Sequence, residues 1–269
     1  MSKSNFFTIL TEAINDFLEY GFDSKKRLEG WLKKLKIAAN KSMMSDEQMN
    51  KEMERALKQA FSRMVYKGGL QSKNVSKYTI DKLKPKLRSE LDRRIMASAN
   101  LIKMNRDKNI QEVLQRFEGW ATSIPKGGSK AVDRVKEKQN IRKSLTKMPF
   151  EQRRVIIDQT HKLVSNINDI VAVDAGAIAG RWHSHWKQPN YNYREDHRER
   201  DEKIYVIKGN WASDKGYIKA INGYTDDITM PGEEVYCRCN YTYLYNLRQL
   251  PDEMLTQKGK AVLQLSKIS

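Results

Sequence analysis

The stretch EVYCRCNYTYLY, residues 234–245, decides the fold class, together with the shorter run KIYVIKG at residues 203–209. In both, aromatic and β-branched residues alternate with polar ones, which is typical of short strands. Asn222-Gly223 lies between them and predicts a tight turn. Helical periodicity covers residues 5 to about 118 and returns from Phe150 to about residue 173. The sequence therefore predicts an α+β fold: a helix-rich N-terminal part with long helices, followed by a small C-terminal domain with a long helix and short antiparallel strands.

Helical periodicity dominates the first half of the chain. Apolar residues recur every three or four positions, as on one helix face, in one stripe of Phe6, Leu10, Ile14 and Phe17 and another of Met49, Met53, Leu57, Phe61 and Met64. Ser45 with Gln48 predicts a capping box at the start of the second stripe. Pro85 is expected in the first turn of a further helix. The apolar positions from 87 to 117 fit one long helix or two shorter ones.

Composition suggests four parts. Residues 1–118 form a basic helical region, and the segment GWATSIPKGGSK at 119–130 predicts a linker or hinge, because it concentrates Gly, Ser and Pro without apolar periodicity. Residues 131–246 form the C-terminal domain, in which a basic helical piece at 131–147 precedes a helix from Phe150 to about residue 173. Residues 247–269 are expected to be a tail that is weakly ordered after Pro251.

The positive charge is concentrated in the middle of the chain. The 269 residues carry 50 Lys and Arg against 33 Asp and Glu, and residues 51–150 alone carry 25 basic and 10 acidic side chains. Such a segment attracts polyanions by releasing their counterions, so nucleic acid is the expected partner. A solvated helix face or an acidic protein partner would explain the same charge. The candidate phosphate contacts are Lys82, Lys84, Lys86, Arg88, Arg93 and Arg94.

Neither a membrane protein nor a disulfide-framed secreted protein is indicated. The longest apolar stretch, IVAVDAGAIAG at 170–180, is interrupted by Asp174 and is much shorter than the roughly 20 residues that span a bilayer. The N-terminal residues have no signal-peptide pattern. Two cysteines are too few for a disulfide framework. We therefore expect no membrane span and synthesis in the cytoplasm.

A candidate metal site lies in the C-terminal domain. Three of the four histidines, His183, His185 and His197, lie near the strands, as do both cysteines, Cys237 and Cys239. Thiolates and imidazoles are the donors that zinc prefers, so Cys237, Cys239, His197 and His185 are the candidate ligands. The CxC spacing differs from the CxxC of standard zinc fingers. The alternative is that the histidines are partly buried polar anchors.

No catalytic residue is predicted. The paired carboxylates Asp226-Asp227 and Glu233-Glu234 suggest acid–base chemistry, but adjacent acids in a turn usually face water. An enzymatic alternative is a metal-dependent nuclease in which His183 or His185 activates water and His197 holds a divalent ion. Its spacing matches no nuclease pattern, and two thiolates favour a closed structural site.

The same region resembles the Mu F-like minor head proteins of tailed bacteriophages. The resemblance rests on an ordered set of motifs: Trp182-His183-Ser184, Arg194-x-x-His197, a turn into the strand at 200–206, Pro231-Gly232-Glu233, and Cys237-Arg238-Cys239. It covers about residues 176–245, and the long helix before them suits the pattern. Residues 1–148 carry no such motif. Asp201-Glu202-Lys203 departs from the family, where Gly often follows the Asp, which leaves the shape of that turn open.

The resemblance implies a virion component. Members of the family are minor capsid proteins of the portal region inside the head, where they act in head morphogenesis, and some are carried with the DNA into the host. No catalytic activity is established for the family domain. The expected partners are the portal or major capsid protein and packaged double-stranded DNA, with several copies in each virion. In this hypothesis the C-terminal domain docks on the shell and the basic helices face the genome.

Overall fold

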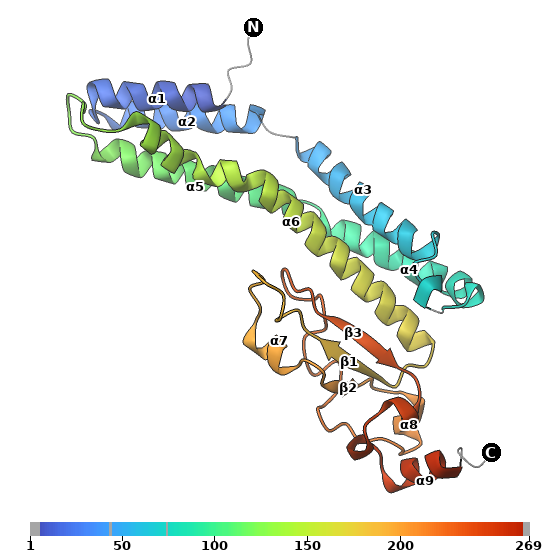
Figure 1. The fold of residues 1–269 in the computed structure, drawn as a ribbon. Coiled ribbons are helices and arrows are strands. Elements are labelled where there is room, and N and C mark those ends of the chain that lie inside the picture. Colours follow the sequence, from blue (N-terminus) through green and yellow to red (C-terminus); the bar gives the residue numbers. More distant parts are fainter. Residues whose placement is uncertain (1–5, 43–44, 74, 266–269) are drawn as a thin grey trace. The chain divides into compact units, whose positions relative to one another are not determined.

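The computed structural model describes residues 6–42, 45–73 and 75–265 (Figure 1). The N-terminal part contains α1 (Phe6–Tyr20), α2 (Lys25–Ser42), α3 (Asp46–Val65), the 3-10 turn η1 (Gln71–Lys73), α4 (Lys77–Ser98), α5 (Leu101–Ser123) and α6 (Arg134–Asp174). The C-terminal part contains β1 (Ala179–His183), α7 (Glu195–Glu199), β2 (Ile204–Val206), α8 (Trp211–Asp214), β3 (Asn240–Leu244), η2 (Leu247–Gln249), η3 (Asp252–Met254) and α9 (Gln257–Leu265). The predicted α+β class is confirmed.

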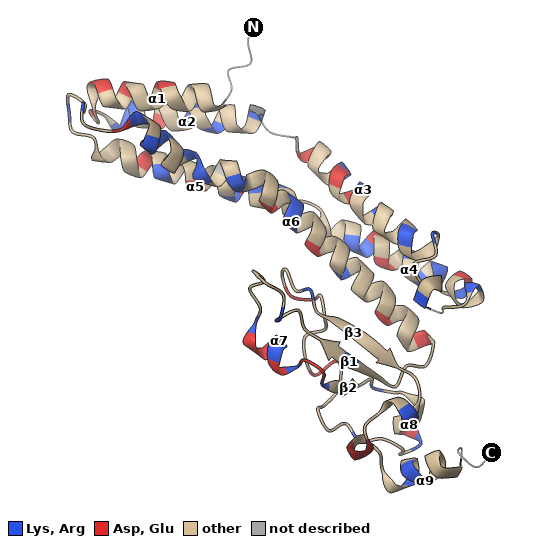
Figure 2. Ribbon diagram, in the orientation of Figure 1, with Lys and Arg blue, Asp and Glu red and all other residues tan. Residues whose placement is uncertain are grey.

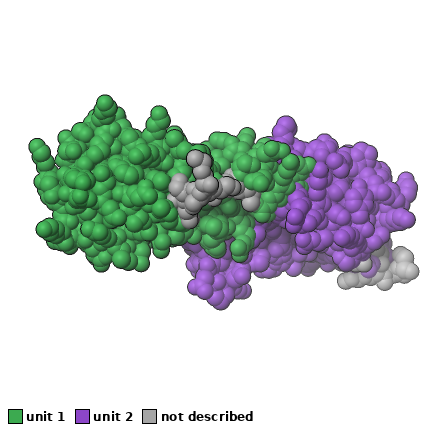
Figure 3. Space-filling view, turned by 90° about the horizontal axis from the view of Figure 1, so that it is seen from above, with its two compact units in different colours: residues 1–54, 98–156 green, residues 55–97, 157–269 purple. Residues whose placement is uncertain are grey.

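The chain groups into two compact units, which Figure 3 colours separately. Unit 1 comprises Met1–Glu54 and Ser98–Ile156, and unit 2 comprises Arg55–Ala97 and Ile157–Ser269. The chain therefore changes unit within α3, at the end of α4 and within α6. Within the described residues, none of the helices is both long and apolar enough to cross a membrane.

Unit 1 is built around one helical core. The predicted stripe of α1 is confirmed, because Phe6, Leu10, Ile14 and Phe17 are all buried. Residues from α2, α5 and the first half of α6 share this core: Leu28, Leu35, Val113, Phe117, Ile141 and Met148. The rings of Phe17 and Phe117 meet edge to face with centroids 5.8 Å apart. This apolar burial is the main stabilising contribution in unit 1.

The segment predicted as a linker at 119–130 lies inside unit 1. Helix α5 continues to Ser123, and the loop after it folds back on the end of α1. The backbone N–H of Gly127 donates to the carbonyl of Tyr20 at 3.0 Å, and that of Ser129 donates to the carbonyl of Leu18 at 2.9 Å. The Gly, Ser and Pro residues therefore form a tight connection between α5 and α6, and the two units divide the chain elsewhere.

Two prolines lie inside helices where the sequence suggested helix starts. Pro85 is an interior residue of α4, which begins at Lys77 because the hydroxyl of Ser76 accepts from the N–H of Thr79 at 3.1 Å. Pro149 is interior to α6, so the basic piece at 131–147 and the helix expected from Phe150 form one helix of 41 residues. The capping box of Ser45 and Gln48 is confirmed, with reciprocal hydrogen bonds of 3.0 and 3.2 Å.

The sheet of unit 2 has the order β2-β1-β3, and both pairs are antiparallel. Side chains alternate between its faces. One face carries aliphatic residues, among them Ala179, Val206 and Leu244, which pack on the C-terminal segment. The other face carries Trp182 and the tyrosines of β3, and the hydroxyl of Tyr243 donates to Asp169 of α6 at 3.0 Å. This aromatic face carries the candidate site.

The predicted strands are present but shorter than the runs that indicated them. β2 covers Ile204–Val206, and β3 begins only at Asn240, so the Cys-Arg-Cys motif precedes the strand. Tyr236, immediately before that motif, has φ of 61°, which is incompatible with a strand. The turn at Asn222-Gly223 is confirmed by a hydrogen bond of 3.1 Å from the Gly223 N–H to the Ala220 carbonyl.

The C-terminal segment was expected to be weakly ordered, and within the described residues it is packed. Met254 and Leu255 are buried against the aliphatic face of the sheet. The N–H of Lys219 donates to the Met254 carbonyl at 2.8 Å, and the N–H of Thr256 donates to the Tyr217 carbonyl at 3.0 Å. Val262 and Leu263 pack against the same core, so apolar contacts and backbone hydrogen bonds together fix this segment. Residues 266–269 lie outside the described part of the chain.

Candidate metal centre

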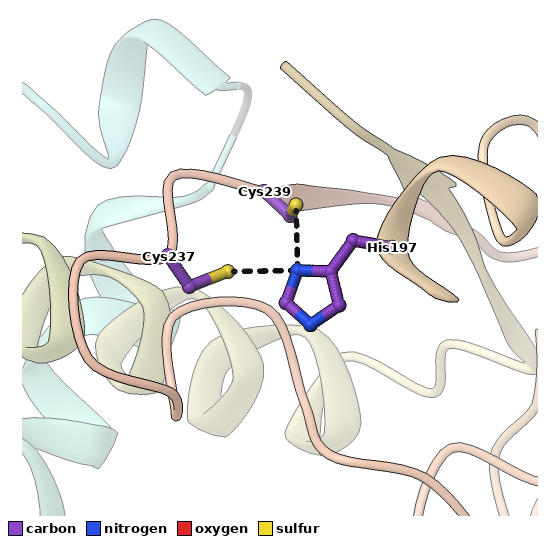
Figure 4. A group of neighbouring side chains, drawn as sticks. All are labelled: His197, Cys237 and Cys239. Atoms are coloured by element: carbon purple, nitrogen blue, oxygen red, sulfur yellow. Dashed lines mark hydrogen bonds between the residues drawn. The ribbon is translucent and has the colours of Figure 1, made fainter. Parts of the chain in front are cut away.

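His197, Cys237 and Cys239 form a buried group beside the sheet (Figure 4). His197 comes from α7, and the two cysteines come from the segment before β3. The Nδ1 atom of His197 lies 3.7 Å from the Sγ of Cys237 and 3.5 Å from the Sγ of Cys239. The exposed fraction is 2% for the histidine and 1% for each cysteine. Three of the four ligands predicted from the sequence are therefore together.

Helix α7 and Trp182 position the histidine. Glu195 and Asp196 occupy the first turn of α7, where carboxylates interact favourably with the helix dipole. The ring of Trp182 meets the His197 ring edge to face, with centroids 5.2 Å apart and an angle of 71°. The guanidinium of Arg200 also lies over the Trp182 ring, 5.2 Å from its centroid. The His197 imidazole therefore packs against the Trp182 ring.

The second half of α6 positions the cysteine segment. The hydroxyl of Ser165 donates to the Pro231 carbonyl at 2.9 Å, and the Nε2 of His161 lies 3.2 Å from the Cys239 carbonyl. Asp158 accepts from the N–H of Tyr236 at 2.6 Å. These three residues of α6 lie at positions i, i+3 and i+7, which share one helix face. The segment from Pro231 to Cys239 is thus anchored along one side of the helix.

Gly232 meets a conformational and a steric requirement. Its φ is 88°, a left-handed conformation that glycine adopts readily, and a Cβ there would lie 3.2 Å from the Cβ of Ser165. In this conformation its N–H donates to the Sγ of Cys237 at 3.4 Å. The Pro231-Gly232 motif therefore places a backbone donor on the thiol.

A carboxylate and an arginine lie behind the histidine. The Oε1 of Glu234 lies 3.5 Å from the Nε2 of His197, and its Oε2 lies 2.6 Å from the Nε of Arg194. Arg194 also donates to the Val235 carbonyl at 2.9 Å. Histidines that bind a metal through one nitrogen commonly face a carboxylate with the other. The Nε2 atom makes no direct hydrogen bond in the described structure, so a small shift of Glu234 would complete this arrangement.

The thiols differ in acidity. The hydrogen bond from the Cys239 thiol lowers the pKa of Cys237 to about 5; burial opposes this shift, and the Gly232 N–H supports it. The pKa of Cys239 is raised, first because its proton is held by the Cys237 sulfur and then by burial. Of the two sulfurs, that of Cys237 is therefore the one favoured as thiolate. A divalent cation between the sulfurs would favour both thiolates.

The distances suit a tetrahedral metal. With Zn–S near 2.3 Å and Zn–N near 2.0 Å, a sulfur and a nitrogen ligand of one zinc ion lie about 3.5 Å apart. The observed separations of 3.5 and 3.7 Å match this value. The ligand atoms of the three residues all lie within 4.8 Å of one another. The group could hold a metal ion.

The other two histidines of the cluster lie outside this group. His185, the fourth ligand expected from the sequence, packs its ring against Tyr191, with centroids 6.4 Å apart, and is not among the described side chains that gather at the sulfurs. His183 uses both ring nitrogens elsewhere: Nδ1 lies 3.0 Å from Glu202 and Nε2 lies 2.8 Å from the Thr242 hydroxyl. Of these two imidazoles, that of His183 is thus engaged away from the sulfurs through both nitrogens.

The turn that departs from the family pattern has a left-handed residue. Glu202 has φ of 64°, the conformation that a glycine would adopt without strain. Its neighbour Asp201 accepts from the N–H of Ser184 at 2.8 Å and from the indole of Trp186 at 2.7 Å. Burial alone would raise the pKa of Asp201, but these two donors lower it. The turn therefore keeps the shape that a glycine favours, with a glutamate in its place.

Sequence reasoning missed two contributors to the site. Glu234 was expected to face water because two acids adjoin, yet it faces His197; its spacing of three residues from Cys237 was a usable signal. His161 was the one histidine outside the cluster. The polar residues at 158, 161 and 165 interrupt the apolar periodicity of α6, which marks a face that contacts something polar. Arg238 of the signature is exposed, and its backbone N–H donates to the Tyr191 hydroxyl at 3.3 Å.

The candidate phosphate contacts on α4 are mostly paired with carboxylates, and Figure 2 shows acidic as well as basic residues in this part of the chain. The pairs are Lys82 with Asp174, Lys84 with Asp81, Arg88 with Asp92, and Arg93 and Arg94 with Glu90. Arg94 is also half-buried, and burial lowers its pKa. Lys86 is exposed and has no ion pair within the described residues. Exposed pairs are weak and exchange with solvent, but they reduce the net charge of this helix.

Comparisons with protein-family models, curated proteins and solved structures find no match for this chain.

Proposed function

We propose that the chain is a minor head protein of a tailed bacteriophage, whose C-terminal module attaches to the portal or major capsid protein. The observation that carries the proposal is the convergence of the motifs on which the resemblance rests. Trp182, His197, Gly232 and the two cysteines are separated by up to 57 residues, yet they meet in one buried centre, and Arg194 adjoins it through Glu234. Motifs that matched by chance would have no reason to share a site.

The centre suits a structural zinc ion. His197, Cys237 and Cys239 would hold it, and the ion would link α7 to the segment before β3. Two thiolates and near-complete burial are typical of metal sites that stabilise a fold. Binding free energy at such a site adds to folding free energy, because the unfolded chain does not preform the ligands. The zinc would thereby fix the surface that the module presents to its partner.

The basic helical region completes the proposal. Packaged double-stranded DNA is a dense polyanion, and cations along helices bind it without reading its bases. The protein would be made in the host cytoplasm, enter the head near the portal in several copies, and contact the genome there. The proposal therefore explains both the basic charge and the helical architecture of residues 51–150.

Protein mass spectrometry of purified particles tests the proposal. Particles of the phage that encodes the chain are separated on a density gradient, and the chain is quantified across the fractions. We expect a constant ratio of this chain to the major capsid protein through the particle peak. Absence of the chain from that peak contradicts the proposal.

One observation favours a second candidate, the metal-dependent nuclease. The group offers three protein ligands, the number found in hydrolytic zinc sites. Burial of those ligands and the engagement of both nitrogens of His183 favour the structural role. A plasmid-nicking assay with Mg²⁺, Mn²⁺ and Zn²⁺ separates the two. We expect no cutting; metal-dependent cutting that is lost in His197→Ala would establish the nuclease.

A further inference from the structure

The first half of α6 carries a straight row of cations. Lys136, Lys143, Lys147 and Arg154 follow one another at intervals of seven, four and seven residues, which places them on one helix face. All four are exposed. At a rise of 1.5 Å per residue the row is about 27 Å long. It lies within unit 1, and Figure 2 shows Lys and Arg along this part of α6.

The helix is oriented by its apolar side. Ile141 and Met148 are buried in the helical core of unit 1, and Ser144 between them is buried as well. The hydroxyl of Ser144 donates to Glu112 of α5 at 2.6 Å. The row is about a third of a helix turn away from these residues, so packing of the core keeps it at the surface.

The lysines of the row differ from the cations of α4. Lys136, Lys143 and Lys147 have no ion pair within the described residues, in contrast to the paired cations of α4. Glu112 accepts a hydrogen bond from the Ser144 hydroxyl, and Glu151 accepts one from the Asn109 amide at 2.6 Å. Within the described residues, Glu112 and Glu151 reduce the positive field of this face but pair with none of the three lysines.

We propose that this row of α6 is the surface of unit 1 that binds the phosphate backbone of duplex DNA. The inference takes its partner, duplex DNA, from the proposed function, on which it rests. It deepens that function by placing the DNA contact on α6 instead of α4. Duplex DNA carries one negative charge per roughly 1.7 Å of its axis, so a straight row of about 27 Å faces phosphates along its whole length. Lysines spaced by whole helix turns bind phosphates as point charges and discriminate between base sequences very little.

Matched charge removal tests the row. The triple variant Lys136→Gln, Lys143→Gln, Lys147→Gln is compared with Lys82→Gln, Lys84→Gln, Arg88→Gln on α4, which removes the same charge from an already paired helix. Binding of the full chain to a labelled duplex is measured from 50 to 200 mM salt, and helicity is checked by circular dichroism. The α6 variant is expected to bind at least about tenfold more weakly, with its log–log salt slope smaller by about 3. The α4 variant is expected to change little.

The outcomes are separable. Wild-type binding with equal losses in both variants, or no loss in the α6 variant, overturns the inference and leaves the proposed function standing. A wild-type chain that does not bind the duplex at 50 mM salt overturns both the DNA contact of the proposed function and the inference. Labelled poly-glutamate of matching charge serves as a third arm. If it binds as tightly and depends on the same lysines, the occupant is an acidic protein surface, which also overturns the inference.

Discussion

Glu202 has a backbone conformation that its side chain disfavours. At φ of 64° an L-residue is less stable than glycine by about 1 kcal/mol, because its Cβ approaches the carbonyl. The turn is held by Asp201, whose carboxylate bonds Ser184 and Trp186, and by the N–H of Glu202 itself, which donates to the Trp182 carbonyl at 2.8 Å. Its position next to Trp182 links this turn to the metal centre.

Replacing Glu202 measures this strain. Glu202→Gly and Glu202→Ala both remove the contact with His183, so the difference between them reports the backbone alone. We expect the glycine variant to be more stable than the alanine variant by about 1 kcal/mol. Urea unfolding followed by circular dichroism gives the comparison. Equal stabilities, or a more stable alanine variant, would contradict a left-handed turn at this position.

At the scale of elements, the prolines of α4 and α6 are the least favourable residues in otherwise regular helices. Pro85 is exposed and interior to α4, where its missing N–H and its ring disfavour the helix. A helix that continues through an interior proline must be stabilised by the packing of adjacent residues. Leu83 and Leu87 on either side of it are buried, which supplies that stabilisation.

Replacing Pro85 by alanine is therefore expected to stabilise the protein. The new N–H restores a helical hydrogen bond, and part of the gain is offset because proline restricts the unfolded chain, which leaves about 2 kcal/mol. The readout is the midpoint of thermal unfolding. Lys86→Ala, at the adjacent exposed position, serves as control and should shift stability by only a few tenths of a kcal/mol. A fall in stability on Pro85→Ala would show that α4 is not continuous through this residue.

Elements defined by local signals could be predicted, and those defined by distant contacts could not. The stripe from Phe6 to Phe17 and the capping box at Ser45 depend only on neighbours in sequence, and both are present. The strand at 234–245 was predicted too long, because alternation does not reveal the left-handed residue Tyr236. The packed end of the chain depends on Met254 and Leu255 meeting a sheet that lies elsewhere in the sequence.

At the scale of the whole molecule, the two units are interleaved in sequence. Unit 1 is interrupted by residues 55–97, so no single boundary separates the units. Composition reveals boundaries only where the chain changes character once, and the Gly- and Pro-rich stretch at 119–130 is a turn inside one unit. The same limit applies to charge. The excess of basic residues at 51–150 could be counted from the sequence, but their pairing with carboxylates could not be predicted.

The candidate site, too, could be predicted from the sequence only in part. Residue chemistry identified His197, Cys237 and Cys239, because few residue types bind zinc and all three occur in one region. It also included His185, whose ring faces Tyr191, and it left out Glu234, which lies behind His197. Side-chain direction in loops depends on tertiary contacts, and these decided both cases.

The metal content of the intact chain tests most directly the claim on which this account depends, that the signature motifs meet to hold a structural metal ion. The protein is purified without chelators and analysed for zinc by mass spectrometry, alongside Cys237→Ser and, as control, His185→Ala. We expect about one zinc per chain in the wild type and in the control, loss in Cys237→Ser, and a lower melting temperature of the wild type after EDTA. Less than about half an equivalent in the wild type, with melting unchanged by EDTA, would contradict the account.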